Sequence, residues 1–327
     1  MSFQAIPIRR RSILTGLSAA AFTSLIASSA SAKSPSQLFE KLRQPLGLQI
    51  GSLGAVPAKD LDAVFARLSE IGYREIELPN LMGRSPKELA EAASRAGLKF
   101  CSLHLPLMAM GGPANLSMLR EPARIADTMA ALGAKWAVAP ILLFPPGFRP
   151  MPGETLEATI ARTIADAGED IWKKTADTLN RRGEALKPLG IGVAYHNHNL
   201  DFRPIGKTTG WEILWRETQA DLVGFEVDIG WVQLAGLDPV RFLRKAKGRI
   251  KLMHVRDMAE SQPRGYRIAM GSPTVGTGRL DWSRIIPAAY DAGARHFIVE
   301  QEPVKDTAPL GAAASAFNYL ARLAPGR

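Results

Sequence analysis

The chain has a single cysteine, and this scarcity excludes two kinds of stabilisation. With only Cys101 among 327 residues, no intrachain disulfide can form and no cluster of thiolates can hold a structural zinc ion. Cys101 lies in an apolar run that is typical of a strand, so we expect its thiol to act as a small buried apolar side chain. Hydrophobic residues make up 46% of the chain, which is enough for one large core.

Blocks of basic residues interleaved with aromatic residues are also missing, which argues against nucleic acid as a ligand. The formal net charge is +10, but lysine and arginine are spread along the chain. A diffuse positive charge is typical of a solvated surface, and it can help to attract anionic ligands. No GxGxxG pattern follows the first strand-like run, so the sequence gives no sign of a dinucleotide-binding fold.

Long apolar segments are absent apart from one near the N-terminus. The run from Ile13 to about Ile26 follows Arg9–Arg11 and precedes Ala30-Ser31-Ala32, a small-x-small cleavage pattern. These features predict a signal peptide over residues 1–32, and Arg-Arg-Ser-Ile-Leu resembles the twin-arginine export motif. An uncleaved anchor is the alternative, but the run is shorter than the ~20 residues of a membrane span.

We therefore expect the twin-arginine translocation machinery to export the folded chain. The mature protein, residues 33–327, would then be soluble and periplasmic, with no stable insertion in the membrane. Whether it forms a homo-oligomer is left open by the sequence.

Short apolar runs alternate with helix-like segments along the rest of the chain. Helix start and stop signals flank the segments between the runs, for example Ser85-Pro86 at one start and Gly72 at one end. Strict alternation predicts a parallel sheet with right-handed crossovers, and eight units fit a closed (β/α)8 TIM barrel, a single domain over 33–327. The expected strands are Leu46–Ile50, Glu75–Leu78, Lys99–Leu103, Trp136–Ala139, Ile191–Tyr195, Gly224–Val227, Ile250–His254 and Phe297–Glu300.

Titratable residues gather where these runs end. The C-terminal ends of barrel strands meet at one mouth, where TIM barrel enzymes place their active sites. Any one of these residues alone is more often a hydrogen-bonded structural residue, but their convergence favours a functional site. His296 begins its run instead, and should lie at the opposite, structural end. The residues at the expected mouth are Glu77, His104, His196, His198, Asp201, Glu226, Asp228, His254 and Glu300.

Several carboxylates at one mouth require a counter-ion, which a divalent cation would supply. The mixture of imidazole and carboxylate suits Mn²⁺, Mg²⁺, Zn²⁺, Co²⁺ or Fe²⁺ and does not select one of them. In a strand, His196 and His198 would point to one side, and Tyr195 and Asn197 to the other. Because a strand end can twist, this alternation leaves both histidines open as the ligand. We favour His198, which is nearer the mouth.

Five segments form a more specific pattern: YHNHNLDF (195–202), FEVDIGWVQLAG (225–236), RIKLMHVRD (249–257), VGTGRLDW (275–282) and FIVEQE (297–302). Through these segments the chain resembles the xylose isomerase-like barrels, the sugar phosphate isomerase/epimerase family. The resemblance extends from Leu46 to about Leu323. It implies a TIM barrel fold and chemistry on a sugar, and it does not identify the substrate.

The resemblance also implies a set of metal ligands. Similar proteins bind one divalent ion through a Glu, an Asp, a His and a second Glu from the fifth to the eighth strands. Asp228, His254 and Glu300 fall on the last three of these positions. At the first position this chain has Tyr195 in place of glutamate, so we assign that ligand to His198, with His196 and Tyr195 as the alternatives.

His104 and Asp201 are the candidate catalytic residues. Asp201 falls where similar ketose epimerases hold a glutamate that contacts the substrate. Trp231 replaces a histidine found in some of these epimerases, which departs from straightforward ketose epimerisation. The implied chemistry is proton abstraction next to a carbonyl, in which the metal neutralises the developing oxyanion and a carboxylate or histidine moves the proton.

Four functions are consistent with parts of this pattern. The first is a divalent-metal-dependent isomerase or epimerase of an unphosphorylated sugar, and the second is a lyase or dehydratase of a keto-sugar, keto-glycoside or inosose that uses the same metal site. An apurinic-site endonuclease on the related barrel is disfavoured, because such enzymes hold three metals with many more histidines than the five found here. A barrel that only binds sugar would show no turnover.

Overall fold

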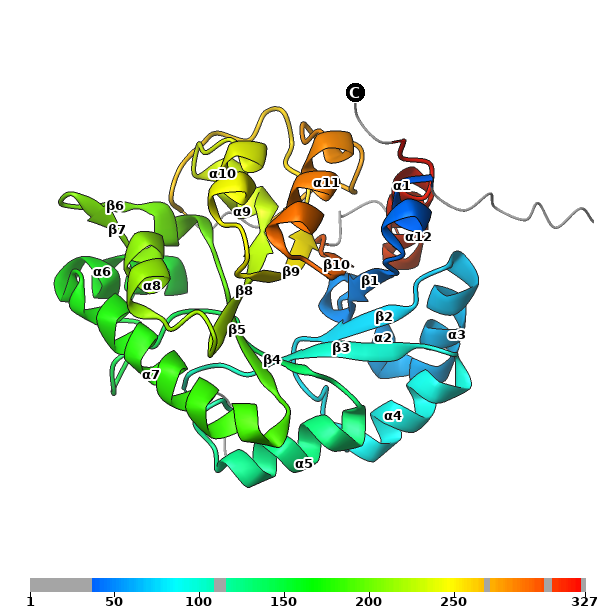
Figure 1. Ribbon diagram of the computed structural model, residues 1–327, viewed down its shortest axis with the longest axis horizontal. Coiled ribbons are helices and arrows are strands. Elements are labelled where there is room, and N and C mark those ends of the chain that lie inside the picture. Colours follow the sequence, from blue (N-terminus) through cyan, green and yellow to red (C-terminus); the bar gives the residue numbers. More distant parts are fainter. Residues whose placement is uncertain (1–36, 109–115, 268–270, 303–307, 325–327) are drawn as a thin grey trace, which may run out of the picture. The chain divides into compact units, whose positions relative to one another are not determined.

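Eight parallel strands close into a barrel in the computed structural model, which describes residues 37–108, 116–267, 271–302 and 308–324 (Figure 1). The sheet closes through pairing of its first and last strands. The prediction of a (β/α)8 barrel is confirmed, and each expected strand agrees with the structure to within one residue at either end. In order around the barrel, the strands are β1 (Leu46–Gln49), β2 (Glu75–Leu78), β3 (Lys99–His104), β4 (Trp136–Ala139), β5 (Gly192–His196), β8 (Val223–Asp228), β9 (Ile250–Val255) and β10 (His296–Val299).

Helices follow the barrel strands and surround the barrel (Figure 1). Short additions that the sequence did not indicate include the two-residue strands β6 (Pro204–Ile205) and β7 (Thr208–Thr209). The expected signal peptide lies outside the described residues. The helices are α1 (Gln37–Leu42), α2 (Val56–Lys59), α3 (Leu61–Ile71), α4 (Pro86–Arg95), α5 (Pro122–Leu132), α6 (Leu156–Ala167), α7 (Asp170–Leu186), α8 (Gly210–Glu217), α9 (Ile229–Leu234), α10 (Pro239–Lys245), α11 (Trp282–Ala292) and α12 (Pro309–Leu320), with 3₁₀ turns η1 (Ile50–Leu53), η2 (Lys187–Leu189) and η3 (Asn199–Phe202).

Capping side chains explain where individual helices begin. At the start of α4, the backbone N–H of Glu88 donates to Ser85 Oγ at 3.2 Å, and the backbone N–H of Ser85 donates to Glu88 Oε2 at 2.8 Å. Asp60 Oδ1 accepts the backbone N–H of Ala63 at the start of α3. That helix stops at Gly72, whose φ of 125° favours glycine.

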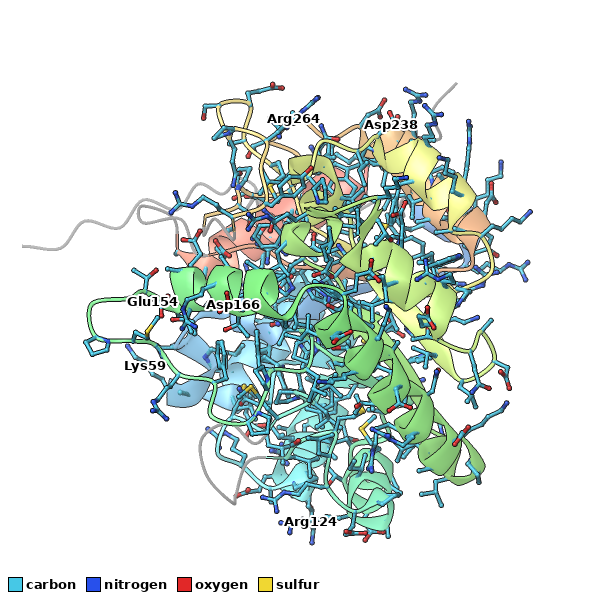
Figure 2. The ribbon with its side chains drawn as sticks, turned by 90° about the vertical axis from the view of Figure 1, so that its left-hand side faces the viewer. Lys59, Arg124, Glu154, Asp166, Asp238 and Arg264 are labelled. Atoms are coloured by element: carbon cyan, nitrogen blue, oxygen red, sulfur yellow. The ribbon has the colours of Figure 1, made fainter. Side chains whose placement is uncertain are left out.

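Apolar side chains fill the layer between the barrel and the helices, and charged side chains lie outside it. Trp172 of α7 and Trp282 of α11 are fully buried in this layer. Arg124, Asp166 and Asp238 are exposed on the outer surface (Figure 2). Within the described ranges, no helix has the length and apolar character needed to span a membrane.

The interior of the barrel has a small apolar layer below a polar one. The apolar layer combines one residue from each of five strands: Cys101, Val138, Ala194, Leu252 and Ile298. Alternation along a strand then places the next inward side chains of β5 and β9 at His196 and His254. The polar groups therefore lie toward the C-terminal ends of the strands, and Cys101 is buried as predicted.

A β-bulge in β3 directs two consecutive side chains into the barrel. Ile76 pairs with Phe100 and Glu77 pairs with Ser102, so Cys101 has no partner in the register with β2. Cys101 Sγ lies 3.3 Å from Ser102 Oγ, whereas Phe100 packs in the outer core. Ser102 Oγ in turn donates to Glu77 Oε2 at 2.6 Å, so the bulge supplies one side chain to each interior layer.

Candidate metal centre and active site

Four side chains of types that can bind a metal ion meet at the C-terminal end of the barrel. His196 closes β5, Asp228 closes β8, His254 lies in β9, and Glu300 directly follows β10. One nitrogen or oxygen atom from each side chain lies within 4.8 Å of those of the other three. Three of the residues are fully or almost fully buried and Glu300 is partly buried. Because the strands are parallel, residues at their C-terminal ends converge on one point, as the sequence predicted for Asp228, His254 and Glu300.

His196, and not the favoured His198, is the histidine of β5 that the structure places in this group. His196 is the last residue of β5 and continues the inward alternation of Ala194. The strand ends there and the chain turns into η3, so alternation no longer holds at His198. The His198 ring lies beside Trp231, with 5.5 Å between ring centroids, and 5.0 Å from the His196 ring. His198 is therefore a neighbour of the group.

Asp228 is fixed on several sides. Its Oδ1 accepts the backbone N–H of Trp231 at 3.1 Å, which caps α9, and its Oδ2 accepts Arg256 Nε at 2.8 Å. The Asn197 side chain accepts the backbone N–H of Asp228 and donates to its carbonyl. Burial raises the pKa of Asp228 to about 7, although Arg256 opposes this change. A nearby cation would favour the ionised form of this carboxyl.

The imidazole of His254 lies between two carboxylates. Its Nδ1 lies 2.8 Å from Glu300 Oε2, and its Nε2 lies 2.7 Å from Glu77 Oε1. Burial would raise the pKa of Glu77, but His104 and His254 lower it well below its usual value, so Glu77 is anionic. Burial would lower the pKa of His254, but Glu226, Glu77 and Glu300 raise it well above its usual value, so both ring nitrogens carry protons in this structure. An ion at the group of four has to displace the proton on Nδ1, and Glu77 then keeps the other proton on Nε2.

His104 and Glu226 form the adjoining part of the polar layer. His104 Nε2 lies 3.0 Å from both Glu77 Oε1 and Glu226 Oε2. Burial would lower the pKa of His104, but the two carboxylates raise it to about 10. Burial and the charge of Glu77 raise the pKa of Glu226 to about 7. The sequence prediction for His104 placed it at the mouth, and the structure brings it together with His196, Glu226 and His254.

Arg256 is a site residue to which the sequence analysis assigned no role. Its Nη2 lies 2.9 Å from Glu300 Oε2, and its Nε bonds Asp228. Its Nη1 lies 3.2 Å from Glu302 Oε1, and its guanidinium lies 4.9 Å from the centre of the Trp231 ring. The available signal was spacing, because Arg256 follows His254 by two residues and lies directly after the last residue of β9, where alternation would still place both side chains on one side.

Asp201 has a different set of partners. Its Oδ2 accepts the Tyr195 hydroxyl at 3.0 Å and the backbone N–H of His198 at 3.2 Å. Tyr195 alternates with His196 and packs in the core between the barrel and the helices, so it points away from the group of four. Burial raises the pKa of Asp201 to about 8. None of the hydrogen bonds found for Asp201 in the described part of the chain comes from the group of four.

The group of four fits a divalent ion. His196 Nδ1 is buried, and within the described ranges it has no hydrogen-bond partner, although Glu226 Oε2 lies 3.2 Å away. Burial and the neighbouring histidines His254 and His198 lower the pKa of His196 well below its usual value, so its ring is neutral, as metal ligation requires. Two imidazoles and two carboxylates are the donors that Zn²⁺, Mn²⁺ and related ions accept.

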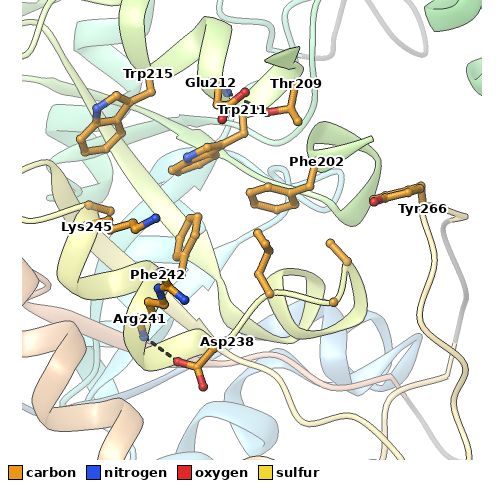
Figure 3. A pocket seen from close by; sticks show the side chains of 14 residues that line it. Phe202, Thr209, Trp211, Glu212, Trp215, Asp238, Arg241, Phe242, Lys245 and Tyr266 are labelled. Carbon is orange, nitrogen blue, oxygen red and sulfur yellow. Dashed lines mark hydrogen bonds between the residues drawn. The ribbon is translucent and has the colours of Figure 1, made fainter. Parts of the chain in front are cut away.

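A separate cavity of about 700 Å³ lies between α8 and α10 (Figure 3). Phe202, Trp211 and Phe242 form much of its wall, and their rings pack on one another at centroid distances of 5.1 to 5.6 Å. Its lining includes exposed charged residues such as Arg241 and Lys245 but no member of the metal-ligating group. We therefore assign the chemistry to the interior of the barrel and not to this cavity.

Comparisons with known proteins agree with this architecture. Residues 65–323 match the family described as Xylose isomerase-like TIM barrel. The inosose dehydratase of Lacticaseibacillus casei is 26% identical over 270 residues, which cover 76% of this chain and 85% of that protein. A sugar phosphate isomerase/epimerase from Parabacteroides distasonis superposes with a TM-score of 0.64 at 24% identity, covering 89% of this chain and 95% of the other. The zinc-bound IOLI protein superposes with a TM-score of 0.60 at 19% identity, covering 85% and 98%.

Proposed function

The chain belongs to the xylose isomerase-like TIM barrel family, and we propose that it is a divalent-metal-dependent enzyme that removes a proton next to the carbonyl of an unphosphorylated sugar. The observation that supports this most directly is the group of His196, Asp228, His254 and Glu300 at the C-terminal end of the barrel. Isomerisation or epimerisation of the sugar is the first outcome that we consider.

In this proposal His196, Asp228, His254 and Glu300 hold the ion, and His196 replaces the His198 of our sequence-based assignment. When bound, the ion supplies Lewis acidity that stabilises negative charge on a carbonyl oxygen. Arg256 holds the carboxylates of Asp228 and Glu300 in place and offsets part of their charge. Glu77 orients His254. These contacts fix the ligands before substrate arrives, which limits the reorganisation needed during the reaction.

We assign proton transfer to His104 and Glu226. A general base is most effective when its pKa lies near the working pH, and the pKa of Glu226 is raised to about 7. His104 Nε2 lies 3.0 Å from Glu226 Oε2, so a proton taken up by one side chain can pass to the other. Asp201, bonded to Tyr195 and to the backbone of His198, supports the segment that follows β5 in this scheme.

Dehydration of a keto-sugar or inosose is the second candidate. It begins with the same proton abstraction but then expels a hydroxyl group from the neighbouring carbon. The specific observation that favours it is the similarity to the inosose dehydratase of Lacticaseibacillus casei. His104, with its pKa raised to about 10, is protonated near neutral pH and is suited to give a proton to the departing hydroxyl.

Incubation with keto-sugars and inososes in deuterated water tests both candidates. The metal-loaded protein should exchange the hydrogen next to the carbonyl. An isomerase or epimerase then returns a deuterated sugar, whereas a dehydratase produces an enone that absorbs ultraviolet light. Asp228→Asn is the control, because Asn still caps α9 but removes a ligand charge. Metal-loaded protein that gives neither exchange nor enone with any of these substrates would contradict the proposal.

We also propose export by the twin-arginine pathway, on the strength of Arg9–Arg11 and the apolar run that follows. A periplasmic location would favour unphosphorylated substrates. Fractionation of cells that express the full chain should recover a shortened protein in the periplasm. Replacing Arg10 and Arg11 by lysine should retain it inside the cell, and periplasmic recovery of that variant in unchanged amount would refute the assignment.

A further inference from the structure

A second group of ligand-type side chains lies at the opposite, N-terminal end of the barrel. Glu75 begins β2, His296 begins β10, and Cys101 is the bulged residue of β3. A carboxylate oxygen, an imidazole nitrogen and the sulfur lie within 4.8 Å of one another. On β10 the inward apolar side chain of Ile298 lies between His296 and Glu300, so this group is distinct from the group of four at the C-terminal end of the barrel.

The bulge and a glycine bring these three side chains together. Without the bulge, Cys101 and Ser102 would alternate across β3, and only one of them would point inward. Strand β1 separates β2 from β10, and its inward position at this level is Gly47. A Cβ atom at Gly47 would lie 3.2 Å from Glu75 Cβ, so the absence of a side chain leaves room there.

The contacts within the group leave donor atoms available. His296 Nδ1 lies 2.9 Å and 3.1 Å from the two carboxylate oxygens of Glu75. The Cys101 thiol donates a weak hydrogen bond to the Ile76 carbonyl at 3.5 Å and lies 3.3 Å from Ser102 Oγ, and an ion that binds the sulfur would replace this bond. Cys101 is buried, whereas the side chains of His296 and Glu75 are 23% and 14% exposed, so an ion can reach the group from solvent.

We propose that Glu75, Cys101 and His296 form a second cation site, which takes Zn²⁺ or a similar ion of intermediate softness with water as the fourth ligand. Zinc bond lengths and tetrahedral angles place ligand atoms roughly 3.3 to 3.6 Å apart, so the group has to contract by little more than about 1 Å. The group of four contains no sulfur, so the two sites differ in their donor atoms and are expected to prefer different ions.

Binding there would stabilise the closed barrel. The three ligands come from β2, β3 and β10, and an ion that joins them ties strands on both sides of β1. Burial and the charges of Glu75 and Glu77 raise the pKa of the Cys101 thiol, so an incoming ion has to displace its proton. An ion that binds the folded chain and not the unfolded chain raises the stability of the fold by mass action.

Cobalt spectroscopy tests this site directly, because the chain has one cysteine. Co²⁺ added to metal-free protein should give a sulfur-to-cobalt charge-transfer band in the near ultraviolet. The band should persist in Asp228→Asn, which impairs the group of four, and should be absent from Cys101→Ala. Zinc should remove the band by competition. His296→Gln keeps the cysteine and should weaken the cobalt affinity that the band reports by about tenfold or more.

Thermal unfolding provides a second measurement that does not depend on activity. Zn²⁺ should raise the melting temperature of Asp228→Asn but not that of the double variant Asp228→Asn/Cys101→Ala. Circular dichroism checks that each variant is folded. If Cys101→Ala does not fold, His296→Gln takes its place in the double variant. The proposal is overturned if cobalt-saturated protein shows no charge-transfer band. It is also overturned if the cobalt affinity measured from the band is the same in His296→Gln as in wild type.

Discussion

Glu77 Oε1 and His254 Nε2 lie 2.7 Å apart in the interior of the barrel, and both side chains are fully buried. The opposite nitrogen of the same imidazole faces Glu300 at 2.8 Å. This contact joins β2 to β9 across the barrel and fixes which nitrogen of His254 is directed at the metal-ligating group. Carboxylates that hold a ligating histidine in this way raise the basicity of the ligand and hold its orientation.

Replacement of Glu77 should therefore weaken metal binding without removing a ligand. We expect Glu77→Gln to lower the affinity for Mn²⁺ by about 10- to 100-fold, because the amide does not stabilise the same tautomer as strongly. Calorimetric titration of metal-free protein measures this. The matched change Glu91→Gln, at an exposed position on α4, should leave Mn²⁺ affinity close to that of wild type. Equal affinities for Glu77→Gln and wild type would show that the contact does not orient His254.

The two histidines that follow Tyr195 should behave differently when each is replaced by alanine. His196→Ala removes a member of the group of four and should reduce Mn²⁺ affinity by at least about 100-fold. This is more than the loss expected for a residue such as Glu77, which only hydrogen-bonds a ligand. His198→Ala removes a ring that packs beside Trp231 and should retain nearly full affinity. The reverse result would restore His198 as the ligand of the fifth strand.

Asp201→Asn should change how stability depends on pH. The ordinary pKa of Asp201 is 3.8 and burial raises it to about 8 in the folded chain. Between these values the folded state holds a proton that the unfolded state has lost, so this residue makes the free energy of unfolding fall as pH rises. Asparagine has no such proton, and it can still accept the Tyr195 hydroxyl. The free energy of unfolding of the variant, minus that of wild type, should therefore increase steadily as the pH rises from about 4 to about 8.

Urea unfolding across this pH range measures the effect, with exposed Asp127→Asn as the control. A difference in stability between Asp201→Asn and wild type that stays constant with pH would mean that Asp201 is ionised in the folded chain. In that case a role for Asp201 as a catalytic base would regain support.

Asp257 should be among the most important carboxylates for stability. It is fully buried at the end of β9, and its two oxygens accept four backbone N–H groups and one indole N–H, from Met258, Gly276, Gly278, Leu280 and Trp282. Asp257→Ala leaves these donors without an acceptor and should lower the free energy of unfolding by roughly 3 kcal/mol or more. Exposed Asp281→Ala should cost only about 0.5 kcal/mol. Similar costs in urea unfolding for both variants would contradict this assignment.

The sequence was sufficient to predict the barrel because each strand is a short buried run followed by helix signals. Burial on both faces makes parallel strands apolar, and the polar residues at their ends then mark the mouth. Asp228, His254 and Glu300 could be placed together on that basis, and the structure brings them together. His296 could likewise be assigned to the opposite end, where it contacts Glu75.

The remaining features depend on geometry that a strand pattern does not contain. Alternation holds only while a strand continues, so it could not separate His196 from His198 once β5 ended. The bulge at Cys101 changes alternation within β3 and has no simple sequence signal. Asp201 follows the same strand as His196, but η3 turns its carboxylate toward Tyr195. Arg256 could have been noticed from its spacing to His254 alone.

Anomalous diffraction from crystals of the Mn²⁺-loaded protein tests the central claim most directly. The account predicts one strong peak at the C-terminal end of the barrel, within bonding distance of His196, Asp228, His254 and Glu300. It would be contradicted by folded protein that takes up no Mn²⁺ there, or by an ion at that end that leaves Asp228, His254 and Glu300 uncoordinated.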